Sequence, residues 1–181
     1  MEKPRETFAA AGCGEYRAVT ERWYQKAIIY CLDAETFQDC DGDGAGDFAG
    51  LTRRLDYLAR LGVDCLWLSP IHPSPGRDGG YDITDYYTVH PRLGTLGDFA
   101  VFLQAADSRG IRVIIDLVVN HTSDKHPWFQ SARASADSPY RDWYVWSERE
   151  PADRRQGIVF PGEQKETWSY DRTAGAWYYH R

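Results

Sequence analysis

The 181-residue sequence has no apolar run of about 18 residues, so it predicts no membrane-spanning helix. Basic residues are not in excess, since 21 Lys and Arg against 27 Asp and Glu give a net charge of −6. That charge disfavours a nucleic-acid partner and suits sugars and other neutral ligands. Residues 1–22 lack the apolar core of a secretory signal, and we expect a flexible tail there. No CxxC pair or metal-ligand spacing occurs, and a reducing cytoplasm is the simplest location for the four cysteines, Cys13, Cys31, Cys40 and Cys65.

What the sequence does contain is an alternation of short apolar runs with amphipathic segments. Apolar residues at three- and four-residue steps predict a helix between Asp47, its N-cap, and Gly62, just past its end. Thr95 and Asp98 have the spacing of a capping box for a second helix, which Gly110 closes. The strand-like runs are Trp23–Leu32, Val63–Ser69 and Val113–Val119. This order predicts an α/β fold with parallel strands, the start of either a doubly wound sheet or an eight-stranded barrel.

The run Val113–Val119 is aliphatic at every position except Asp116. Such a run predicts a strand buried on both faces of a parallel sheet. Asn120 and His121 follow at its carboxyl end, where such folds place binding side chains. A carboxylate inside an apolar strand needs a cationic or donor partner, and the sequence identifies no basic partner for Asp116.

The pattern changes after residue 122. Residues 123–181 show no convincing alternation of helix and strand but are rich in aromatic residues. Residues 166–170 and 176–180 carry aromatics at alternate positions around a short polar turn, which predicts a β-hairpin. We therefore expect a loop-rich insertion after the third strand.

Residues 39–47 place oxygen-bearing groups as in a Ca²⁺-binding loop of the EF-hand kind. Gly44 allows the sharp turn, and Gly50 stands where the usual bidentate Glu would be. Ca²⁺ is favoured and Mg²⁺ stays open, and the alternative is a solvated acidic turn. The predicted ligands are the side chains of Asp39, Asp41, Asp43 and Asp47 and the carbonyl of Ala45.

A second candidate site follows the second strand. Gly79 and Gly80 permit a close turn that presents Tyr81 as a flat platform and Asp82 as an acceptor, both suited to a pyranose ring. The alternative is a turn whose tyrosines pack on the core. His121 is either functional, as its position suggests, or structural.

These residues resemble motifs of the α-amylase family of glycoside hydrolases and transglycosylases. Residues 116–121 (DLVVNH) resemble its signature at barrel strand three, residues 62–70 (GVDCLWLSP) its strand-two signature, and residues 80–82 also match. Residues 39–50, 120–133 and 142–147 are most similar to the trehalose synthase or maltose glucosyltransferase group, with α-glucosidases and oligo-1,6-glucosidases as relatives.

The resemblance implies an incomplete TIM (β/α)8 barrel over residues 23–122 and the start of an inserted B domain over residues 123–181. It implies that Tyr81 stacks on the sugar in the cleaved subsite, while Asp82 and His121 hydrogen-bond its hydroxyls. Asn120 would help to hold Ca²⁺ between barrel and insertion. The sugar would be a small α-glucosidic one such as maltose, trehalose or a malto-oligosaccharide.

The implied reaction is maltose/trehalose isomerisation or glucosyl transfer by a retaining mechanism that uses two carboxylates. The resemblance places these carboxylates beyond Arg181, because they follow later barrel strands. We therefore expect the isolated chain to be inactive. Three alternatives stay open: a sugar- and Ca²⁺-binding module without chemistry, a scaffold or transporter-associated relative, and a truncated product without function.

Overall fold

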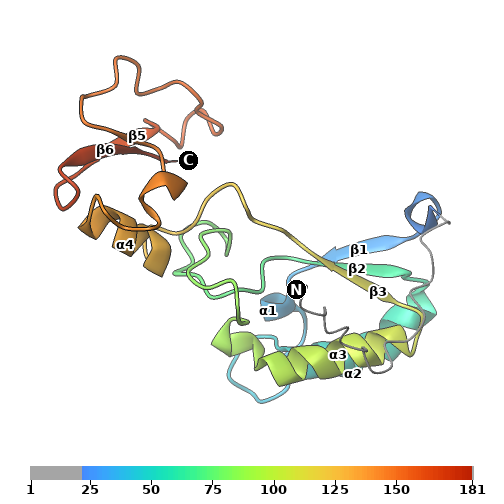
Figure 1. The fold of residues 1–181 in the computed structure, drawn as a ribbon. Coiled ribbons are helices and arrows are strands. Elements are labelled where there is room, and N and C mark those ends of the chain that lie inside the picture. Colours follow the sequence, from blue (N-terminus) through green and yellow to red (C-terminus); the bar gives the residue numbers. More distant parts are fainter. Residues whose placement is uncertain (1–21, 181) are drawn as a thin grey trace, which may run out of the picture.

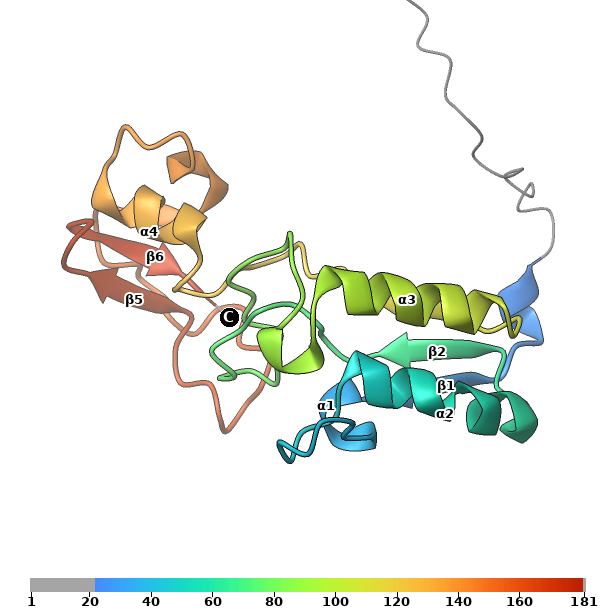
Figure 2. The ribbon, with the colours of Figure 1, turned by 90° about the horizontal axis from the view of Figure 1, so that it is seen from below.

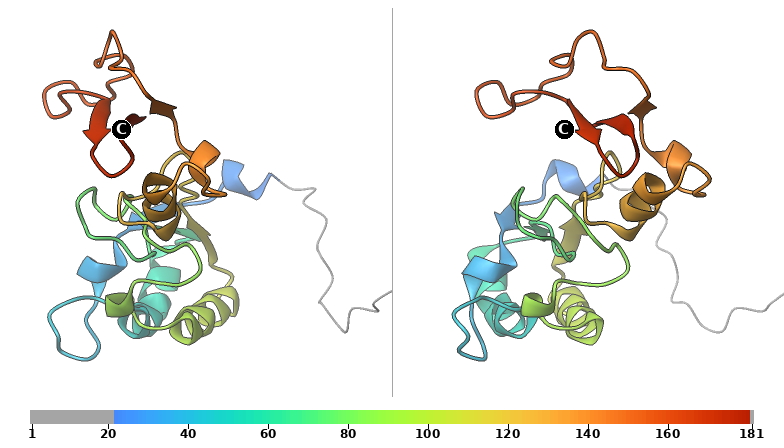
Figure 3. Two further views of the ribbon diagram at one scale, coloured as in Figure 1. Left: turned by 60° about the vertical axis from the view of Figure 1, so that its left-hand side comes forward. Right: turned by 90° about the vertical axis from the view of Figure 1, so that its left-hand side faces the viewer.

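The computed structural model describes residues 22–180, and the predicted tail lies outside them except for Arg22. Its elements form two regions, one with a parallel sheet and two long helices and the other with a short helix and an antiparallel sheet (Figures 1 and 3). No helix within residues 22–180 is long and apolar enough to cross a membrane.

The first sheet contains β1 (Ile29–Leu32), β2 (Cys65–Leu68) and β3 (Arg112–Ile115) in that order. Both pairs are parallel, and Cys65 of β2 lies opposite Ile29 of β1 and Arg112 of β3. The predicted succession of parallel strands is therefore confirmed, although each strand is shorter than its apolar run. A 3-10 turn, η1 (Trp23–Gln25), precedes β1.

Two helices cover one face of this sheet, as Figure 2 shows. In α2 (Phe48–Leu61), Asp47 is the N-cap and accepts from the Gly50 N–H at 2.6 Å, while Gly62 ends the helix with φ 87°. In α3 (Leu96–Asp107), Thr95 and Asp98 form the predicted capping box. These local predictions are confirmed. The core between helices and sheet includes Phe48, Leu51, Leu55, Leu66, Leu68 and Phe102, all fully buried.

The prediction that Val113–Val119 is buried on both faces is wrong. The strand ends at Ile115, and beyond it Leu117 and Val119 are 81% and 77% exposed. Because α2 and α3 cover only one face of the sheet, side chains on the other face stay open, among them Trp67 and Ile114. The apolar character of residues 113–119 therefore does not predict their burial within this chain.

Residues 39–47, called the acidic loop below, connect α1 (Ala34–Phe37) to the first turn of α2. Asp33 caps α1. A Cβ atom on Gly50 would overlap the carbonyl oxygen of Gln38. Glycine is unfavourable inside a helix, so its presence in α2 is explained by this close backbone approach.

The second region contains α4 (Pro127–Ala134), the 3-10 turn η3 (Arg141–Trp143) and strands β4 (Trp146–Ser147), β5 (Trp168–Asp171) and β6 (Ala176–Tyr179). The strands are antiparallel in the order β4-β6-β5, so the predicted hairpin is confirmed. Helix α4 was not predicted. His126 caps it by accepting from the Trp128 N–H at 3.1 Å, and Pro127 occupies its first turn.

An ion pair ties α4 to the hairpin. Nη2 of Arg133 lies 2.7 Å from Oδ2 of Asp171, whose side chain is only 7% exposed. Phe129 of α4 also packs against Tyr144, Trp146 and Tyr178. Helix and hairpin therefore share both an apolar and an ionic contact.

Candidate functional site

The candidate sugar-binding residues lie where β2 and β3 end, on two segments that hydrogen bonds join. The long loop after β2, which contains the 3-10 turn η2 (Pro91–Leu93), is hydrogen-bonded to the segment after β3 at four points, one of them the ion pair of Arg77 with Asp124 at 3.4 Å. The Ser123 N–H donates to the Ile83 carbonyl at 2.9 Å, and the Tyr86 hydroxyl donates to the His121 carbonyl at 2.8 Å. The third contact joins Tyr81 to Asp116. The segments that follow β2 and β3, which are far apart in the sequence, thus form one surface.

Tyr81 stands on the two-glycine turn that was predicted. Gly79 and Gly80 have φ values of 55° and 93°, which residues other than glycine rarely adopt. The Tyr81 N–H donates to the Asp78 carbonyl at 2.9 Å. The Tyr81 side chain is 38% exposed, so its ring is available to a ligand. The alternative of tyrosines packed on the core therefore does not hold for Tyr81, whereas Tyr86 of the same loop is half-buried and stacks on Trp128.

Asp116 has the donor partners that its sequence position required. Its Oδ2 accepts from the Tyr81 hydroxyl at 2.9 Å and its Oδ1 from the Trp67 indole N–H at 3.0 Å. The hydrogen bond to the carboxylate raises the pKa of Tyr81, since the neutral phenol is the form that donates. Both donors are neutral and distant in sequence, and for this reason a search for a basic partner missed them.

Asp82 and His121 lie on the same surface but differ in how far their side-chain polar atoms are hydrogen-bonded. The Asp82 carboxylate accepts from the Ser74 hydroxyl and from the Arg77 N–H, the latter at 3.2 Å. His121 is half-buried, its Nδ1 lies 3.3 Å from the Asn120 amide nitrogen, and its buried Nε2 has no hydrogen-bond partner among residues 22–180. Buried polar atoms without a partner are rare in folded proteins, and this one marks His121 as a candidate functional residue.

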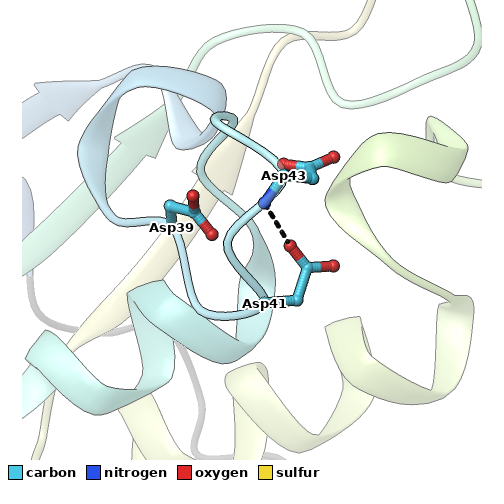
Figure 4. Close-up of side chains that lie close together, drawn as sticks. All are labelled: Asp39, Asp41 and Asp43. Carbon is cyan, nitrogen blue, oxygen red and sulfur yellow. Dashed lines mark hydrogen bonds between the residues drawn. The ribbon is translucent and has the colours of Figure 1, made fainter.

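The acidic loop brings together three of the predicted ligands. One carboxylate oxygen from each of Asp39, Asp41 and Asp43 lies within 4.8 Å of the other two, and Figure 4 shows the three side chains on this loop. Asp39 accepts from the N–H groups of Gly42 and Gly44, and these bonds lower its pKa, so the carboxylate stays charged. Three converging charged oxygens are the donor set that hard cations such as Ca²⁺ prefer.

The other predicted ligands are placed differently. Asp47 is buried and uses Oδ1 for the Gly50 N–H and Oδ2 for the Cys40 N–H, so it is engaged as a helix cap. The backbone N–H of Ala45 donates to Asp43 at 2.7 Å. Asn120 is exposed and lies beside His121, on the candidate sugar-binding surface. Among residues 22–180, the acidic side chains that gather as a possible cation-binding group are those of Asp39, Asp41 and Asp43.

A cleft of about 220 Å³ opens where β1 and β2 end, next to the candidate sugar-binding surface. Its lining includes Asp33, Ser69, His72, Ser74 and His90, but not Tyr81, Asp82 or His121. Ser74 connects the two places, because its hydroxyl also donates to Asp82. We locate the candidate site by the side chains at the strand ends and treat the cleft as its neighbour.

Comparison with known proteins identifies the family. Residues 30–181 match the family described as "Alpha amylase, catalytic domain". The chain belongs to the alpha-amylase family. The resemblance inferred from residues 62–70, 80–82 and 116–121 is thereby confirmed.

Relatives within the alpha-amylase family include sugar-converting enzymes. The chain is 48% identical to a trehalose synthase of Pimelobacter sp. over 88% of its own length and 28% of that protein. It is 45% identical to an oligo-1,6-glucosidase of Heyndrickxia coagulans, over 87% of the chain and 28% of the relative. The crystal structure of Bacillus licheniformis trehalose-6-phosphate hydrolase superposes with a TM-score of 0.81 at 40% identity, covering 87% of this chain and 28% of that one. The chain thus spans about a quarter of the length of these relatives.

Proposed function

We propose that this chain forms the N-terminal part of an alpha-amylase-family enzyme that acts on α-glucosidic bonds by a retaining mechanism. Maltose/trehalose isomerisation or glucosyl transfer is the proposed reaction, in line with the trehalose synthases among the relatives. One observation supports this most directly. An exposed tyrosine ring, a carboxylate and an unpartnered buried imidazole nitrogen, those of Tyr81, Asp82 and His121, lie on loops that follow neighbouring parallel strands.

The three side chains would divide the recognition of a glucose unit between them. Tyr81 offers an apolar face on which a pyranose ring can stack. Asp82, held by two donors from its own loop, can accept from sugar hydroxyls with its remaining lone pairs. His121 would pair its unpartnered Nε2 with a further hydroxyl once a turn of the ring exposes that buried atom. Residues 23–122 would belong to the catalytic (β/α)8 barrel and residues 123–181 to the start of its B domain.

A Ca²⁺ ion at Asp39, Asp41 and Asp43 is a further part of the proposal. The ion would neutralise three carboxylates that lie within 4.8 Å of one another and would fix the loop between α1 and α2. Asn120, which borders the sugar-binding surface, is the proposed ligand of a second ion. The bound metal would stabilise the fold rather than take part in bond cleavage.

We assign neither carboxylate beside Tyr81 to catalysis. Asp116 accepts from the Tyr81 hydroxyl and the Trp67 indole N–H, and Asp82 is proposed to bind sugar hydroxyls. A retaining mechanism uses one carboxylate as nucleophile and another as acid and base, and the family resemblance places both on later barrel strands, outside these 181 residues. We therefore expect residues 1–181 alone to bind sugar without converting it.

Titration calorimetry of the 181-residue chain with maltose and trehalose tests this proposal, and chromatography of the same mixtures tests for products. We expect saturable binding, no product, and loss of binding in Tyr81→Ala. Tyr87→Ala is the matched control, since Tyr87 is 78% exposed and, among residues 22–180, only its backbone N–H is hydrogen-bonded. Equal binding by both variants, or no binding by the unmodified chain, would refute the assignment of Tyr81.

A further inference from the structure

We infer that Asp116 is a positioning residue: its carboxylate holds the ring of Tyr81 in one orientation by tying it to Trp67. This inference rests on the proposed function, because it concerns how the sugar platform is kept in place. It adds a residue that touches no ligand itself and acts through its neighbour.

The geometry gives each carboxylate oxygen one donor. The Trp67 indole N–H lies 3.0 Å from Oδ1, and the Tyr81 hydroxyl lies 2.9 Å from Oδ2. Trp67 belongs to the middle strand β2, and Asp116 follows the last residue of β3. The bridge therefore connects two strands of the sheet to the loop that carries the platform.

Tyr81 needs such an anchor because little else restrains its side chain. Its backbone is fixed by the turn, where its N–H donates to Asp78 and its carbonyl accepts from Ile83. The side chain is 38% exposed, and within residues 22–180 its one polar contact is with Asp116. A ring held in its bound orientation loses less conformational entropy when a ligand stacks on it.

Trp67 determines which oxygen is left for Tyr81. Its indole N–H can only donate, as can the Tyr81 hydroxyl when it faces a carboxylate, so the bridge requires two acceptors. A carboxylate supplies both, whereas an amide supplies one oxygen and a donor NH₂ group. Asp116→Asn keeps the size of the side chain but presents an NH₂ donor to Tyr81, so the Tyr81 hydroxyl must change from donating to accepting and loses its charge-assisted hydrogen bond.

The first test measures the ionisation of Tyr81 by alkaline difference absorbance. Subtracting the curve of Tyr81→Phe from that of the unmodified chain isolates Tyr81, and the same subtraction is made in the Asp116→Asn background. We expect Tyr81 to ionise at lower pH in that background, because the carboxylate that disfavours the tyrosinate is gone. An unchanged curve would overturn the tether. Because burial also raises the pKa of Tyr81, an unfolded variant would shift in the same direction, so only folded variants are compared. Circular dichroism confirms that each variant is folded.

The second test is a double-mutant cycle on maltose affinity. Tyr81→Phe keeps the stacking ring and removes only the hydroxyl, so it serves as an independent variant should Asp116→Asn fold poorly. We expect each substitution to weaken binding roughly two- to tenfold and the double variant to be no weaker than Asp116→Asn alone. Tyr87→Phe should bind like the unmodified chain.

The possible outcomes separate the inference from the function on which it rests. Additive effects, or a Tyr81→Phe variant with normal affinity, would overturn the positioning role. If the unmodified chain bound no maltose, the proposed function would fail and the sugar-positioning role with it. The ionisation of Tyr81 would still decide whether the bridge to Asp116 exists.

Discussion

Replacement of Asp171 by Asn should destabilise the second region strongly. The change removes the charge that Arg133 faces at 2.7 Å but keeps Oδ1, which accepts from the N–H groups of Thr173 and Ala174. Loss of one partner of a buried ion pair costs roughly 3–5 kcal/mol. Because the Arg133 side chain is 29% exposed, water replaces part of the interaction, and we expect about 2–3 kcal/mol.

Urea unfolding followed by tryptophan fluorescence measures this effect. A loss of that size corresponds to a melting temperature roughly 5–10 °C lower for a chain of this length. Asp171→Ala should cost more than the Asn variant, since two backbone N–H groups then also lose their acceptor. Arg172→Ala is the control, because Arg172 is exposed and its side chain makes no polar contact among the described residues. If Asp171→Asn unfolded within about 0.5 kcal/mol of the unmodified chain, the ion pair would not be the link between α4 and the hairpin.

Four further measurements test other parts of the structure. Removing Ca²⁺ with a chelator should lower the melting temperature of the unmodified chain, and the double variant Asp41→Asn/Asp43→Asn should be destabilised only when Ca²⁺ is present; an equal loss in chelator would contradict the metal site. Burial lowers the pKa of His126 below its usual 6.5, so on acidification the unfolded chain takes up this proton at a higher pH than the folded chain does. The free energy of unfolding should therefore fall as the pH drops from 7 to 5. His126→Asn, which keeps a capping acceptor, should flatten this slope in urea titrations, and an unaltered slope would exclude His126 as its source. Thr95→Ala should cost about 1 kcal/mol through loss of the α3 cap, measured by the same unfolding assay, and no change would mean that the cap is dispensable. Gly50→Ala should destabilise the chain despite the better helix propensity of alanine, because its Cβ would overlap the Gln38 carbonyl, whereas a rise in the urea midpoint would contradict that close approach.

Features specified by neighbouring residues could be predicted from the sequence. The caps at Asp47 and Thr95 depend on side chains that reach backbone groups within a few residues, and both were predicted correctly. The same holds for the hairpin of β5 and β6, whose turn is short. Helix α4 was missed because its N-cap, His126, is outside the common set of capping residues and the helix extends for only eight residues.

Features that depend on distant residues could not be predicted in this way. The burial of residues 113–119 depends on which faces of the sheet are covered, and an apolar pattern does not report that. The two donors to Asp116 stand 49 and 35 residues away, and nothing local marks them. Within the candidate site, residue types and loop positions were predictable, whereas the bridge from Tyr81 to Trp67 and the unpartnered Nε2 of His121 required the three-dimensional arrangement.

The two sheets also differ in how far apart in sequence their paired residues lie, and this has a consequence for folding rate. In the hairpin, Asp171 pairs with Ala176, and hairpins of this kind form in roughly 1–10 μs. The parallel sheet pairs Ile29 with Cys65 and Cys65 with Arg112, so long chain segments must close before any strand contact forms. We expect the hairpin to be complete while the strands of the parallel sheet are still unpaired and able to pair with those of another molecule. The yield of refolded chain should therefore fall as protein concentration rises, even under conditions in which the final fold is stable.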